Sequence, residues 1–286
     1  MKHIFKISVI LIIFSILFSQ TSCEKNTTNE LNNSPIEQRS DFINPYDFIG
    51  QVHNDIMTYY AENLTLILNY DEFSYKDMIQ LTYNKSIELL DSSYTNVTLN
   101  DYVFEFENTN FSFPFNDTLE NVLDFIKTEN AIFDKYSTDF KTNIIDYLLN
   151  PNLDFFTCLP EFNSLIKEFE LLIISDSTNS EIDETFMLMF TAVFKYSLTQ
   201  AINEFSDEDH PFNPYYYGSL RDELSTAEVI TIVVADAYGA GKGAALAAPT
   251  GPGGMLLIGV GYGVLASCCA GTSIGVIDAI ADWWDS

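Results

Sequence analysis

Apolar residues recur every three to four positions through most of the chain, a spacing that predicts a mainly α-helical protein. The stretch that begins at Asn44, just before a proline, starts with a helix-entry signal and places Ile49, Val52 and Ile56 on one side. The same spacing predicts further helices over residues 74–90, 118–126, 131–149, 160–174 and 182–205. The last of these is apolar nearly all round, so we expect it at the centre of its domain.

One segment in this helical pattern alternates with a period of two instead. Phe104 and Phe106 are separated by glutamates, and three more phenylalanines alternate with other residues up to Phe115. This alternation predicts a small β-hairpin over residues 102–115 that turns near 108–110. Its second strand contains a proline and would therefore lie at an edge.

The end of the chain carries small residues at intervals of four. They are Thr231, Ala235, Gly239, Gly243 and Ala247, then, after a breaker at 249–254, Gly259, Gly263, Ser267, Gly271 and Gly275. This spacing predicts two helices whose small-residue ridges allow their backbones to approach closely. Glycine inside a helix costs about 1 kcal/mol relative to alanine, so such a series requires a compensating contact.

Three interpretations of this C-terminal hairpin stay open from the sequence. Residues 255–277 are uncharged and long enough to span a bilayer, whereas residues 229–248 contain Asp236 and Lys242, which are costly in lipid. In one interpretation the hairpin is buried against the rest of the chain, and in another it enters or lies on a membrane. Extended loops are the third alternative.

The first residues of the chain predict a secretory signal peptide over residues 1–22. Lys2 and Lys6 give it a basic start, and an apolar segment over residues 7–18 is short for a membrane span. Two small residues then precede Cys23. Cleavage by an ordinary signal peptidase nearby, with an incidental Cys23, is the alternative.

This start resembles the bacterial lipoprotein signal, although Gln20 stands where that family usually has leucine. The resemblance implies that the signal peptide is cut before Cys23 and that Cys23 becomes the diacylated first residue. Acyl chains contribute about 0.8 kcal/mol per buried methylene, so they would anchor the protein in a lipid bilayer without a spanning helix. Residues 23–43 are polar and predict a flexible tether.

The predicted organisation after the tether is an acidic helical domain over residues 44–222 and a glycine-rich apolar helical hairpin over residues 223–286. The 286-residue chain has a net charge of −28 at pH 7, with 41 acidic and 13 basic residues. Such a balance excludes nucleic acid as a partner, because phosphate binding requires clustered Lys and Arg. The expected partners are a bilayer through acylated Cys23, and a bilayer or a protein through the hairpin.

Catalytic and metal-binding motifs do not emerge from the sequence, so no cofactor or metal is predicted. The cysteines lack metal-ligand spacing, and His53 has apolar turn neighbours that favour packing over ligation. The stretch GAGKGAA from Gly239 lacks the spacing and the hydroxyl residue of a phosphate-binding loop. Acidic pairs are too common here to identify a working pair from sequence, which leaves a hydrolase as an outside alternative.

Two quoted stretches carry a resemblance to a wider group. NPYDFIGQVHN from Asn44 and ADAYGAGKGAA from Ala235 are similar to stretches in uncharacterised lipoproteins of the Bacteroidota. The resemblance implies an exported, membrane-anchored lipoprotein, at the outer membrane or cell surface rather than the inner membrane, and brings no activity with it. We therefore expect a non-enzymatic structural or interaction module. A membrane-active, bacteriocin-like protein is the alternative, and an envelope or carbohydrate hydrolase comes third.

Overall fold

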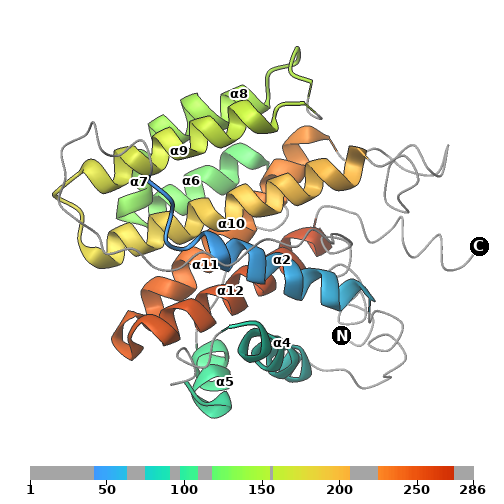
Figure 1. Ribbon diagram of the computed structural model, residues 1–286, viewed down its shortest axis with the longest axis vertical. Helices are drawn as coiled ribbons and strands as arrows, with labels where there is room; N and C mark the ends of the chain where they lie inside the picture. Colours follow the sequence, from blue (N-terminus) through green and yellow to red (C-terminus); the bar gives the residue numbers. More distant parts are fainter. Residues whose placement is uncertain are drawn as a thin grey trace, which may run out of the picture.

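The computed structural model describes residues 42–62, 75–90, 97–108, 118–154, 157–206 and 225–273. Most of these residues are helical, and no β-strand occurs among them (Figure 1). The predicted mainly α fold is confirmed. The predicted signal peptide, Cys23 and most of the tether lie outside the described residues, as does Gly275.

The described part of the chain forms ten α-helices in sequence. They are α2 (Asp47–Glu62), α4 (Tyr75–Leu89), α5 (Leu99–Asn108), α6 (Leu119–Glu129), α7 (Ala131–Phe140), α8 (Asp146–Leu148), α9 (Leu159–Ser175), α10 (Glu181–Ser206), α11 (Thr226–Ala247) and α12 (Pro252–Ser273). A π-helical turn, Lys141–Ile145, joins α7 to α8. A 3-10 turn, Ala248–Thr250, follows α11.

Side-chain caps fix the starts of several helices. Thr118 caps α6, Asn130 caps α7, and Ser225 caps α11 by accepting a hydrogen bond from the Glu228 amide. The Glu228 carboxylate in turn accepts from the Ser225 amide at 2.6 Å, which completes a capping box. Caps of this kind satisfy amides that a helix start leaves without a partner.

The predicted β-hairpin over residues 102–115 is wrong in its first half, which forms α5. The amide of Thr98 donates to the Asp101 carboxylate at 3.2 Å, and the Asp101 amide donates to the Thr98 hydroxyl at 3.3 Å. This reciprocal pair starts a helix, and Tyr102 of the first turn is fully buried. The capping signal thus favours a helix over the strand that the alternation of phenylalanine and glutamate predicts. Residues 109–115 of the predicted hairpin lie outside the described residues.

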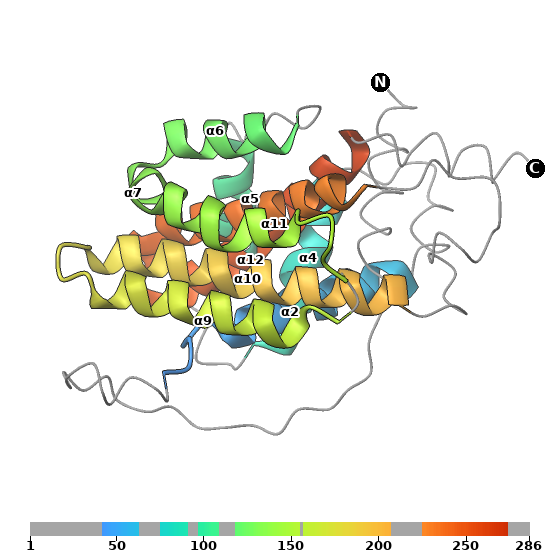
Figure 2. The same cartoon turned by 90° about the horizontal axis from the view of Figure 1, so that it is seen from above.

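The helices pack in layers around two apolar cores that meet at α10 and α11. Figure 1 shows α6, α7 and α9 above this pair and α2, α12, α4 and α5 below it, and Figure 2, seen from above, shows α6 and α9 at opposite edges of the upper group. Met189 and Val193 of α10 belong to the core under α2 and α4, whereas Phe190 and Phe194 belong to the core under α7 and α9. Because α10 carries apolar residues on all sides, it can contribute to both cores, in agreement with the central position predicted for it.

Aromatic side chains fill the second core. The ring of Phe140 lies 5.2 Å from the rings of both Phe190 and Phe194, edge to face in each case. Such pairs contribute about 0.5–1.5 kcal/mol each beyond the area they bury. The abundance of phenylalanine is therefore explained in this region by core packing.

Candidate functional site

The C-terminal hairpin is formed by α11 and α12, which make the most extensive contact of any helix pair in the described structure. The 3-10 turn joins them, and Gly251 after it has a φ of +83°, a left-handed conformation that favours glycine. Both helices are buried by other parts of the protein, because α10 and α6 pack on α11 while α2 and α4 pack on α12. The hairpin is thus the inner element of the molecule.

Glycines allow the two helices of this hairpin to approach closely. A Cβ added at Gly243 would lie 2.7 Å from the Ile258 carbonyl oxygen and 2.8 Å from the Tyr262 Cβ. One added at Gly239 would meet the Tyr262 carbonyl oxygen and lie 2.7 Å from the Ala266 Cβ. These distances are below ordinary van der Waals contact, so the backbones lie closer than a side chain allows.

The facing residues of α12 include the predicted Gly259 and Gly263. A Cβ at Gly263 would lie 3.3 Å from the Ala240 Cβ, and one at Gly259 would lie 3.5 Å from the Ala244 Cβ. Ala240 and Ala244 were not part of the predicted ridge. The signal for them was present in the sequence, because they form a second four-residue series of small residues beside the first.

The remaining predicted ridge residues lie in different surroundings. Ala235 belongs to the core under α7 and α9, and Ala247 belongs to the core under α2 and α4. Ser267 and Gly271 lie within α12. The structure therefore places the close contact in the half of the hairpin nearer the turn, from Gly239 to Gly243 on the first arm.

Helix α2 covers α12 and is fastened along its length. Its Gly50 lies against α10, where an added Cβ would be 2.7 Å from the Ala192 carbonyl oxygen. His53 lies against α12, with its Cδ2 atom 3.1 Å from the position of a Cβ at Gly263. Ile56 and Met57 are buried in the core that α2 shares with α12.

His53 is a buried polar residue at this α2–α12 interface. Its side chain is 1% exposed, and Nδ1 lies 3.2 Å from Oδ1 of Asn54. Nε2 is buried without a well-formed hydrogen bond. Burial lowers the pKa of His53 to about 4, although Asn54 and the Gly263 backbone favour the protonated ring. The ring is therefore neutral at pH 7, and a proton on it would be poorly solvated.

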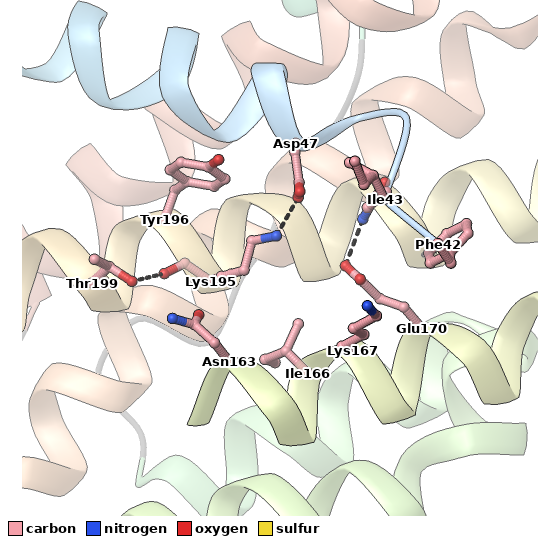
Figure 3. A pocket seen from close by; sticks show the side chains of 11 residues that line it. Phe42, Ile43, Asp47, Asn163, Ile166, Lys167, Glu170, Lys195, Tyr196 and Thr199 are labelled. Carbon is pink, nitrogen blue, oxygen red and sulfur yellow. Dashed lines mark hydrogen bonds and ion pairs between the residues drawn. The ribbon is translucent and has the colours of Figure 1, made fainter. Parts of the chain in front are cut away.

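A polar pocket of about 360 Å³ lies where the chain enters α2, between α2, α9 and α10 (Figure 3). The Asn44 side-chain amide donates to Glu170 at 2.6 Å and to the Leu188 carbonyl at 2.8 Å. The Thr191 hydroxyl also lies 2.9 Å from the same Glu170 oxygen. Asn44 is thereby fixed to α9 and α10 immediately before α2 begins.

Two carboxyl groups line this pocket. Burial raises the pKa of Asp47 and of Glu170, and the nearby Lys195 opposes the shift in both cases. Asp47 forms an ion pair with Lys195, which connects α2 to α10. Glu170 accepts a hydrogen bond from Asn44, which connects the residues just before α2 to α9. Sequence reasoning missed this cluster, because its members are far apart along the chain.

Two charged residues within the hairpin lie in different surroundings. Asp236 is 2% exposed, and the Lys242 ammonium lies 5.4 Å from the centre of the Tyr238 ring. By length and composition alone, one helix among the described residues, Thr226–Thr250, is long and apolar enough to cross a membrane. Most of its residues are buried inside the protein, as in the core helix of a globular domain.

No protein-family model, curated protein or solved structure matches the chain. The class that fold and site define is an all-α protein in which amphipathic helices enclose an apolar helical hairpin. The functional assignment therefore depends on the chain's own residues.

Proposed function

We propose that this protein is a bacterial cell-envelope lipoprotein, exported and anchored through acylated Cys23, whose helical body acts as a structural or interaction module. The N-terminal pattern and the similarity to Bacteroidota lipoproteins support the anchor. The outer membrane or the cell surface is the proposed location. The polar tether before residue 44 would hold the body at a short distance from the bilayer.

The burial of the hairpin is the observation that carries this proposal. In the structure α12 is enclosed by α2 and α4, and α11 by α10 and α6, so the most apolar part of the chain already has partners. Among the described residues, the hairpin therefore packs against protein in this state. Attachment to the membrane in this state therefore falls to Cys23.

The polar pocket at the start of α2 supports a structural role for its carboxyl groups. A working acid–base pair needs a carboxyl group that can exchange its proton with a substrate. Here Asp47 is paired with Lys195, and a Glu170 oxygen accepts from both Asn44 and Thr191. The arrangement fits the fastening of α2 better than hydrolysis, and it favours a non-enzymatic module.

The anchor can be tested by replacing residues 1–23 with a cleavable secretory signal that has no following cysteine. The matched control is the natural chain expressed in the same cells and labelled with radioactive palmitate. We expect label on the natural chain only, and we expect the replaced chain in the soluble fraction of the envelope. A replaced chain that stays with the membrane would contradict the proposal, as would a natural chain without label.

A further inference from the structure

Both arms of the described hairpin are long enough to cross a bilayer, and the second arm also matches its polarity. Helices α11 and α12 have 22 residues each, which is about 33 Å at 1.5 Å per residue, against a hydrocarbon core of about 30 Å. Throughout Pro252–Ser273 there is no charged residue. The close contact at Gly243 gives the two arms a shared surface that does not depend on the surrounding helices.

One of the two helices that cover α12 is α2, which follows the predicted tether; the other is α4. Asn44 fixes the start of α2, and Asp47 pairs with Lys195 one turn further on. Farther along, His53 faces Gly263 of α12. A change at the start of α2 or at His53 would therefore loosen the cover over α12, while the hairpin keeps its own contacts.

His53 gives this cover a sensitivity to acid. A proton on the ring would place a charge in a buried interface, where Nε2 has no well-formed hydrogen bond. The ring bonds only to Asn54 among the described side chains. The described charged groups of α2 and α11, and of the helices packed against α2, are Asp47 and Asp55 in α2, Glu181, Asp183, Glu184 and Lys195 in α10, Lys85 and Glu88 in α4, and Glu228, Asp236 and Lys242 in α11. The groups that favour a proton on the ring are Asn54 and the Gly263 backbone.

We propose that the α11–α12 hairpin is a membrane-inserting element that α2 keeps covered, and that protonation of His53 releases α2 so that the hairpin enters a lipid bilayer. Asp236 lies near the middle of α11, where a charged side chain is the main cost of insertion. Lys242 lies nearer the turn, and its long side chain can extend toward the headgroups. The proposal does not depend on the acylation of Cys23.

The natural tryptophans provide a direct probe of insertion. The chain contains two, Trp283 and Trp284, and both follow α12 in sequence. The processed full chain would be mixed with vesicles of phosphatidylethanolamine and phosphatidylglycerol that carry brominated acyl chains and a trapped dye. We expect bromine quenching of tryptophan fluorescence and dye release near pH 4, and neither at pH 7. Failure of quenching at both values would overturn the proposal.

The role of His53 is tested with two matched variants. His53→Gln removes the titrating group, and His210→Gln makes the same change at the other histidine that follows the predicted signal peptide. We expect the first variant to lose most of the acid-induced quenching, by about tenfold or more in rate, and the second to behave as the natural chain. Equal behaviour of the two variants would overturn the assignment of the trigger to His53.

A variant with a gain of function guards against simple misfolding. Asn44→Ala removes the hydrogen bonds that fix the start of α2, whereas Asn163→Ala alters an exposed residue that lines the same pocket. We expect Asn44→Ala to quench at pH 7, with helical circular dichroism retained, and Asn163→Ala to need acid. A folded Asn44→Ala chain without quenching at pH 7 would overturn the role of α2 as the cover.

Discussion

Adding one methyl group at Gly243 tests the close approach of α11 and α12. The new Cβ would lie 2.7 Å from the Ile258 carbonyl oxygen and 3.0 Å from the Gly259 Cα, and both are backbone atoms. Because ordinary contact begins near 3.4 Å, the helices would have to separate locally by about 0.7 Å. A gap of that size removes about a quarter to a half of the dispersion energy of the atoms it separates.

The expected free-energy change follows from two opposing effects. Overpacking of a tight contact costs about 1–3 kcal/mol, whereas replacing glycine by alanine in a helix gains about 1 kcal/mol. We therefore expect Gly243→Ala to lower the free energy of unfolding by up to about 2 kcal/mol. Urea denaturation followed by circular dichroism at pH 7 would measure the change. The slope of the free energy of unfolding against urea concentration, the m-value, should stay the same.

Gly259→Ala in the facing helix is the matched control. Its Cβ would meet the terminal methyl group of Met189 at 2.5 Å, and the nearest backbone atom is the Ala240 carbonyl oxygen at 3.1 Å. A flexible side-chain end can move for about 0.5–1.5 kcal/mol, which roughly offsets the gain in helix propensity. We expect this variant to be close to wild type. A Gly243→Ala protein as stable as Gly259→Ala would refute the inferred backbone approach.

Three further predictions concern the interfaces of α2. Asn44→Ala should lower the free energy of unfolding by about 2–3 kcal/mol in urea denaturation, because it leaves the buried Glu170 short of a donor, whereas Asn163→Ala should be neutral. Glu170→Gln should raise stability at pH 7 in the same assay. Burial raises the pKa of Glu170 above its ordinary 4.5, so the wild type loses stability as the pH rises past 4.5 and the buried carboxyl group ionises. The difference in stability between Glu170→Gln and the wild type should therefore vanish in acid. Burial lowers the pKa of His53 from 6.5 to about 4, so the free energy of unfolding should fall by about 3 kcal/mol as the pH drops between those values. His53→Gln should flatten this part of a plot of stability against pH. An unchanged slope would contradict the burial of the neutral ring.

The sequence by itself determined the helical class and the small-residue series of the C-terminal arms. Helix periodicity is a local property, so the windows over 131–149 and 182–205 correspond closely to helices in the structure. Gly243 and Gly259 could be identified because a four-residue interval places small residues on one side of a helix. The error at residues 102–108 of the predicted hairpin was local as well, because the reciprocal capping pair of Thr98 and Asp101 starts a helix despite the alternation.

The tertiary structure decided which elements cover the hairpin and which polar groups meet. Asn44 and Glu170 are 126 positions apart, and Asp47 and Lys195 are 148 apart, so no local pattern relates them. Because α10 is apolar on all sides, its sequence does not indicate which of its faces packs in which core. A series of small residues likewise has the same spacing whether it faces a protein helix or lipid. Only the packing of α2 and α4 on α12 shows that this hairpin is enclosed by protein in the folded state.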